Sequence, residues 1–107
     1  MNGIAGRLSA ASRATVWRGR SGTSYALVPE KLDSFSLAPT ALYLIARGSM
    51  VLWVGTAEDV IADQQSRARF RLALAAADRA FRVAAEPELA TIWDLEGAEP
   101  EAGLSAA

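Results

Sequence analysis

Two short apolar runs flank a turn in the stretch ALYLIARGSMVLWVG, residues 41–55. The first run, Leu42–Ile45, leads into Arg-Gly-Ser, a typical hairpin turn, and the second run, Val51–Val54, returns directly. Successive side chains of a strand face opposite sides, and both sides are apolar in this hairpin. We therefore predict that the two runs pair antiparallel at the centre of a small sheet that is covered on both faces by helices.

A helix is expected immediately after the hairpin. Thr56 is a favourable N-cap residue, and Asp59 occupies the capping-box position three residues later. The helix should therefore begin near Ala57. Its apolar stripe lapses across DQQSR and resumes near Phe70, which predicts either two helices or one bent helix.

The remaining segments add a hairpin, a loop, a strand and a last helix. In chain order they are the strands TVWRG and TSYALVP around the turn RGRSG, the loop EKLDSFSLAPT, the strand RAFRVAA and the helix within EPELATIWDLEGAEP. The order predicts an α+β fold with a small antiparallel-centred sheet, flanking helices and an N-terminal β-hairpin. The apolar residues that recur on one face of each element should form the core: Leu44, Val54, Ile61, Phe70, Leu74, Val83 and Leu89.

Composition limits the domain organisation and the chemistry. A chain of 107 residues with 51% hydrophobic content has the material for one core, so we expect a single domain over residues 14–103, a flexible arm over 1–13 and a frayed tail over 104–107. The chain has no cysteine and no histidine, which excludes thiolate and imidazole chemistry. No apolar run approaches the length of about 18 residues that suggests a membrane span. We expect a cytoplasmic protein without a membrane partner.

The order strand, strand, helix, helix, strand, helix resembles that of the GIY-YIG nuclease superfamily. ALY and WVG fall where that family carries its two name motifs, and the separation of Tyr43 from Trp53 is close to its usual spacing. TAEDV is similar to the start of the helix after the second motif. The stretch WRGRSGTSYALVPEKLDSF resembles the lead-in of small bacterial GIY-YIG-like proteins, and LATIWDLEGAEP resembles their last helix. The resemblance covers about residues 14–103 and implies a GIY-YIG-like β-β-α-α-β-α fold.

The resemblance also implies positions for an active site. In these nucleases a first tyrosine helps to activate water, a second tyrosine supports it, a helical arginine holds the scissile phosphate, and a glutamate on the last helix binds a divalent metal. The matching positions here are Tyr43, Trp53, Asp63 and Trp93. An aspartate repels the phosphate, and a tryptophan cannot ligate a hard cation. The resemblance thus implies a non-catalytic binding module for nucleic acid or protein, without a cofactor. A purely structural interpretation of the four residues is the simpler one.

Two alternatives remain open at this stage. A shift of one residue puts Asp94 in the metal position, and Glu96 is a further carboxylate, so a Mg²⁺-dependent endonuclease with a rearranged site is one alternative. The other is an interaction domain of gelsolin-like type, because LYLIARGSMVLWVG and the Ala-rich helix after it resemble the central hairpin and helix of that repeat.

Partners can be suggested only by class. Arg67, Arg69 and Arg71 are the candidate nucleic-acid-binding residues, although a solvated helix face is the commoner explanation of such a run. The net charge of −1 gives no support for strong nonspecific binding to nucleic acid. Three tryptophans in a short chain are compatible with an exposed apolar area and a homo-oligomer.

Overall fold

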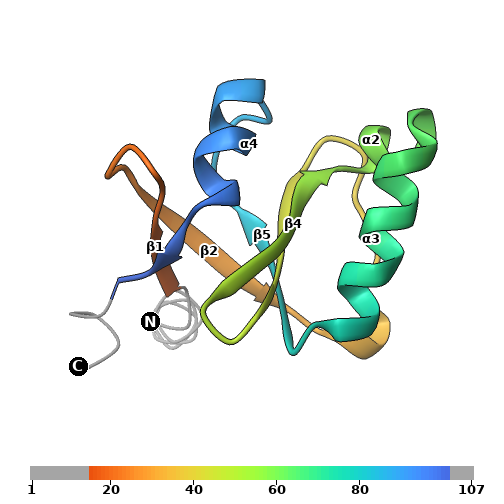
Figure 1. The fold of residues 1–107 in the computed structure, drawn as a ribbon, viewed down its shortest axis with the longest axis horizontal. Helices are drawn as coiled ribbons and strands as arrows, with labels where there is room; N and C mark the ends of the chain where they lie inside the picture. The colour runs from red at the N-terminus through yellow and green to blue at the C-terminus, as the bar shows by residue number, and fades with distance from the viewer. Residues whose placement is uncertain (1–14, 102–107) are drawn as a thin grey trace, which may run out of the picture.

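The computed structural model describes residues 15–101 and shows an α+β fold with one six-stranded sheet (Figure 1). In chain order, the elements are β1 (Thr15–Arg18), β2 (Ser24–Glu30), the 3-10 turn η1 (Leu32–Ser34), β3 (Leu42–Arg47), β4 (Met50–Thr56), α2 (Ala57–Ala62), α3 (Gln64–Ala76), β5 (Arg79–Val83), α4 (Leu89–Glu96) and β6 (Glu99–Pro100). The predicted order β-β-α-α-β-α is present from β3 to α4. The arm predicted for residues 1–13 and the tail for 104–107 lie outside the described residues.

All strand pairs are antiparallel, in the order β4-β3-β5-β2-β1-β6. The predicted N-terminal hairpin is β1–β2, and the predicted strand RAFRVAA becomes β5, which lies between β3 and β2. The short strand β6 was not predicted. It pairs with β1 after the chain leaves α4 at Gly97.

The hairpin β3–β4 forms as predicted, with Leu44 opposite Val54 and Ile45 opposite Trp53. Gly48 has a φ of 59°, the left-handed conformation that favours glycine in a tight hairpin turn. The prediction of a central position is correct for β3 and wrong for β4, which is the terminal strand of the sheet. Strand pairing beyond the hairpin depends on distant segments, so the local pattern could not decide which strand takes the edge.

Strand β3 separates two hydrophobic clusters, and this explains why both of its faces are apolar. Its residues from Leu42 to Ala46 are all buried. On the side of α4, Leu44 packs with Trp17, Leu95 and other residues of β1, β2 and β5. On the side of α2 and α3, the cluster contains Tyr43, Ile45, Trp53, Ala73 and Ala80. Figure 1 shows α3 on one side of β4 and α4 on the other. The predicted cover on both faces is confirmed.

The core prediction is correct for the strands and wrong for two helical residues. Leu44, Val54 and Val83 are buried, and Phe70 and Leu74 are half-buried at the edge of the α3 cluster. Ile61 in α2 and Leu89 in α4 are 76% and 86% exposed. Both belong to short helices, where a few apolar residues do not determine which face meets the sheet.

Two separate helices follow the hairpin, and each begins with a side-chain cap. Thr56 and Asp59 form the predicted capping box at the start of α2. Asp63 then interrupts the helix and caps α3, accepting a hydrogen bond from the backbone N–H of Ser66 at 3.1 Å. Among residues 15–101, no helix has the length and apolarity needed to cross a membrane.

Candidate functional site

Tyr43 and Trp53 lie together in the cluster under α3, where both are buried. The Tyr43 side chain is 2% exposed, and its hydroxyl oxygen accepts a hydrogen bond from the backbone N–H of Ala38 at 2.8 Å. Its ring meets Phe35 edge to face, with the centroids 5.3 Å apart. Trp53 packs against Phe70 in the same manner, at 4.8 Å. Both side chains hold α3 and the loop before β3 against the sheet.

The other two positions implied by the resemblance lie elsewhere. Asp63 is exposed at the junction of α2 and α3, where the hydrogen bonds from Ser66 hold the pKa of its carboxyl below the ordinary value. Trp93 is on α4, is 58% exposed and is not part of the cluster that contains Tyr43. The structure therefore brings Tyr43 and Trp53 together but does not gather all four residues around one site.

Asp94 forms the centre of a polar cluster that joins α4 to the turn between β1 and β2. Its carboxylate accepts hydrogen bonds from the backbone N–H of Ser21 at 2.6 Å, from the Ser21 hydroxyl at 2.7 Å and from the Tyr25 hydroxyl at 2.7 Å. The residue is only 5% exposed. A Cβ atom at Gly19 would lie 2.5 Å from this carboxylate, so the turn needs a glycine there. We name Asp94, Ser21, Tyr25 and Gly19 the Asp94 cluster.

The hydrogen bonds of the Asp94 cluster determine its protonation states. The Tyr25 hydroxyl, followed by the two donors of Ser21, holds the pKa of Asp94 below the ordinary value, although burial acts in the opposite direction. The same hydrogen bond, together with burial, raises the pKa of Tyr25 to about 12. Asp94 is therefore ionised and Tyr25 protonated at neutral pH.

Arg20 completes the contact between the turn and α4. Its Nε atom donates to the backbone oxygen of Trp93 at 2.9 Å, and its guanidinium carbon lies 4.7 Å from the centroid of the Trp93 ring. This cation–π contact gives Trp93 a partner on the surface. This arrangement was not predicted from the sequence, where Asp94 was a candidate metal ligand only. The turn signal RGRSG was visible, but its docking partner was not.

The two carboxylates considered for a metal do not form a metal site in the described part of the chain. Asp94 already accepts three hydrogen bonds, and a cation would have to displace donors that close the turn. Glu96 is exposed at the end of α4 and forms no hydrogen bond or ion pair with residues 15–101. Within these residues, no group of three acidic side chains is placed to hold a metal ion.

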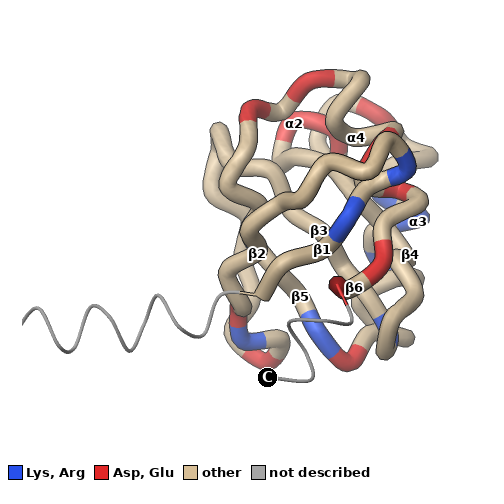
Figure 2. Tube along the Cα trace, turned by 90° about the vertical axis from the view of Figure 1, so that its left-hand side faces the viewer, with Lys and Arg blue, Asp and Glu red and all other residues tan. Residues whose placement is uncertain are grey.

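The three arginines of α3 do not share one face. The Nε atom of Arg67 donates to the backbone oxygen of Val60 at 3.1 Å and so ties α3 to α2. Arg69 and Arg71 are exposed. Residues two positions apart in an α-helix point in directions that differ by about 200° around its axis, so these two side chains leave the helix on different sides. Figure 2 shows basic and acidic residues interspersed along the described chain. The predicted arginine run therefore does not produce one continuous basic surface.

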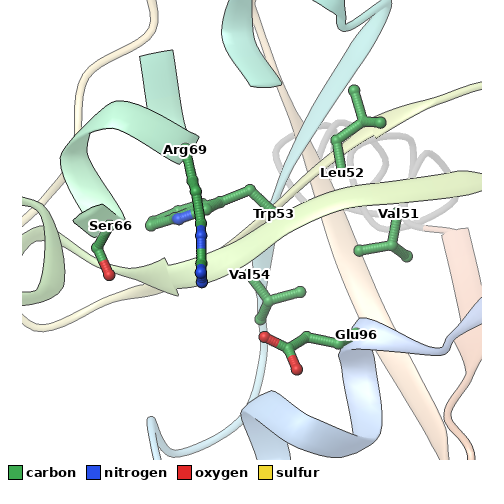
Figure 3. A pocket seen from close by; sticks show the side chains of 7 residues that line it. All are labelled: Val51, Leu52, Trp53, Val54, Ser66, Arg69 and Glu96. Carbon is green, nitrogen blue, oxygen red and sulfur yellow. The ribbon is translucent and has the colours of Figure 1, made fainter. Parts of the chain in front are cut away.

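A shallow groove of about 260 Å³ follows the outer edge of β4. We call it the β4 groove, and it is lined by Val51, Leu52, Trp53, Val54, Ser66, Arg69 and Glu96. Figure 3 shows Arg69 reaching from α3 across the strand on one side and Glu96 at the end of α4 on the other. Neither side chain has an ion-pair partner among residues 15–101. Arg69 and Glu96 were separate candidates in the sequence, and their position at one groove was not predicted.

Comparison with known proteins found no match to this chain among family models, curated proteins or solved structures.

Proposed function

We propose that this chain is a non-catalytic GIY-YIG-like domain that binds another protein. The resemblance in the sequence supports the family, together with the order β3-β4-α2-α3-β5-α4. This proposal keeps the cytoplasmic location that was expected from the sequence. The observation that carries the binding function is the β4 groove, in which a strand edge that is unpaired among residues 15–101 lies between two charged side chains that form no ion pair with those residues.

The environments of Tyr43 and Asp94 support a non-catalytic role. A tyrosine that activates water needs access to the substrate, whereas the Tyr43 hydroxyl is buried and bonded to Ala38. Asp94 directly follows, in the sequence, the metal position implied by the resemblance, and its hydrogen bonds close a turn. Asp63, in the arginine position, supplies the wrong charge for a phosphate.

A protein partner fits the surface better than nucleic acid. Binding to a phosphate backbone depends on several cations that act together. Here Arg67 is engaged within the fold, and Arg69 and Arg71 face different sides of α3. The gelsolin-like alternative leads to the same class of function, because the six-stranded sheet with the long helix α3 on one face also fits an interaction domain of that type.

The test compares peptides with oligonucleotides as ligands of the immobilised protein. A displayed library of random ten-residue peptides and labelled single- and double-stranded DNA and RNA are applied at low and at physiological salt. We expect enrichment of peptides and no retention of oligonucleotides at physiological salt. Retention that weakens with salt and is lost in the double variant Arg69→Ala, Arg71→Ala would instead support a nucleic-acid partner.

A further inference from the structure

The outer edge of β4 is available for strand pairing. Strand β4 has seven residues and is terminal in the sheet, so every second residue directs its backbone N–H and C=O away from β3. Within residues 15–101, no further strand or loop forms a backbone hydrogen bond with this edge. Proteins usually cover, shorten or charge such an edge because it is a template for another strand. Here the edge is seven residues long; Arg69 reaches across it from α3, and Glu96 stands on the α4 side.

The two walls of the β4 groove carry opposite charges. On the α3 side the wall is formed by Trp53, Ser66 and the cation of Arg69, and on the α4 side by Val54 and the carboxylate of Glu96 (Figure 3). Since α3 and α4 cover opposite faces of the sheet, the two charges lie above and below the same strand edge. An added strand would meet both.

The α3 side also has an apolar hollow next to Arg69. A β-bulge between Ile45 and Ala46 leaves Leu52 as an extra residue in β4, and Leu52 packs on the α3 side beside Trp53. The hollow is lined by Leu52, Arg69, Leu72, Ala73 and Ala76, and Leu72 is 72% exposed. This side therefore offers both apolar contact and a cation to an incoming side chain.

We propose that β4 binds an extended segment of a partner protein as an added edge strand. The segment places an acidic side chain beside Arg69, an apolar one in the hollow at Leu72 and a basic one beside Glu96. Main-chain hydrogen bonds to β4 supply the common part of the affinity, and the side chains supply the specificity. This inference rests on the proposed protein-binding function and assigns its site and its ligand chemistry.

A second copy of this chain fits the same edge poorly in the antiparallel arrangement. Two copies of β4 that pair antiparallel are related by a two-fold axis perpendicular to the sheet, so the α3 sides of both copies lie on one face. Arg69 would then meet the side that carries the other copy's arginine, and Glu96 would meet the side with the other glutamate. Like charges suppress such pairing. For antiparallel pairing, the edge thus favours a different sequence with the complementary charges over a second copy of β4.

The site predicts a spacing rule for its ligand. Neighbouring residues of an extended strand face opposite sides. The positions of an acidic residue beside Arg69 and a basic residue beside Glu96 must therefore differ by an odd number in the ligand sequence, such as one or three. Peptides with the same composition but an even separation place both charged side chains on one face of the strand. One of the two then faces a like charge of the groove or no charge.

The experiment uses the whole chain, peptides selected from the random library and two matched pairs of variants. Arg69→Glu is paired with Arg71→Glu, which makes the same charge change on the same helix outside the groove. Glu96→Lys is paired with Glu86→Lys, which changes an exposed loop residue. All four side chains are exposed and form no hydrogen bond or ion pair within residues 15–101, and circular dichroism checks that each variant folds.

The dissociation constants of synthetic selected peptides are measured by fluorescence anisotropy. We expect the selected peptides to carry acidic and basic residues at odd spacing. Their binding should be about ten-fold weaker to Arg69→Glu and to Glu96→Lys and unchanged to the two controls. A peptide with lysine in place of its acidic residue should regain binding to Arg69→Glu. Amide hydrogen exchange should slow at the outward N–H groups of residues 50–56 when the peptide binds.

The contrary outcomes separate this inference from the proposed function. Peptides that bind all four variants equally would overturn the β4 site while leaving a protein-binding module in place. Failure to enrich any peptide would overturn both. A dimer in sedimentation experiments with concentration-dependent protection of the amides of β4 would show that a second copy takes the edge, contrary to the inference.

Discussion

The hydroxyl of Tyr25 in β2 donates a hydrogen bond of 2.7 Å to the carboxylate of Asp94 in α4, although 69 positions separate the two residues in the sequence. The bond holds the last helix against the N-terminal hairpin. It also shifts the pKa of both partners in opposite directions, upward for Tyr25 and downward for Asp94. The protein should therefore respond to pH at both ends of the range.

At high pH, Tyr25 should ionise later than an ordinary tyrosine. Its pKa in the folded protein is about 12, against an ordinary value of 10.0. Because the folded-state pKa is raised, the stabilisation is complete below the unfolded-state value and is lost as pH rises through the folded-state value. We expect the tyrosinate absorbance of Tyr25 to appear near pH 12, and in Asp94→Asn to shift towards the ordinary value. Tyr25→Phe identifies the step, since the chain has only one other tyrosine.

At low pH, protonation of Asp94 should destabilise the fold. Its folded-state pKa is lowered, so the stabilisation is present above the unfolded-state pKa of about 4 and is lost as pH falls below that value. Urea unfolding measured from neutral to acidic pH should show a shallower decline in Asp94→Asn than in the unsubstituted protein. Asp33→Asn, an exposed aspartate in η1, is the control and should keep the original decline. Equal declines in all three proteins would contradict the assignment.

In the core, Leu44→Ala should lower the free energy of unfolding by about 2–5 kcal/mol, because the side chain is fully buried in the cluster between the sheet and α4. Leu89→Ala is the matched control, since the same atoms are removed from a side chain that is 86% exposed. It should change stability by less than about 0.5 kcal/mol. The comparison is made by denaturant unfolding. Similar losses of unfolding free energy in both variants would show that Leu44 is not a packed core residue.

Purified protein should not cleave DNA with Mg²⁺ or Mn²⁺. With the Tyr43 hydroxyl buried, Asp63 in the arginine position and Asp94 engaged, the family positions within residues 15–101 hold no group that stabilises the charge at a phosphate. Nicking of supercoiled DNA and cleavage of branched and single-stranded DNA should match the background of a Tyr43→Phe preparation. Metal-dependent cleavage that disappears in Tyr43→Phe would establish the nuclease alternative, with Asp94 or Glu96 as the candidate ligand.

Local features were predicted well because their causes are local. The capping box of Thr56 and Asp59 connects residues three positions apart, and the turn at Gly48 connects two adjacent strands. The apolar character of both faces of Leu42–Ile45 was enough to predict cover on both sides. The exposure of Leu89 was not predictable in this way, because a short helix has too few apolar residues to show which side it buries.

The candidate sites were predicted less well than the elements that carry them. From the sequence, Asp94 and Glu96 were candidate metal ligands, and Arg69 was a candidate phosphate contact. Only the docking of the turn after β1 onto α4 reveals that Asp94 is a structural acceptor. Only the strand order reveals that Arg69 and Glu96 flank a strand edge that is unpaired among residues 15–101.

By itself, the sequence determined the α+β class, the hairpin β3–β4 and the capped start of α2, since these follow from side-chain periodicity, capping and turn residues over a few positions. The tertiary structure alone decided that β4 takes the edge of the sheet, that Asp94 meets Ser21 from 73 positions away, and which charges face the same groove. The physical reason is that such contacts depend on how complete elements pack together, and no short stretch of the sequence contains both partners.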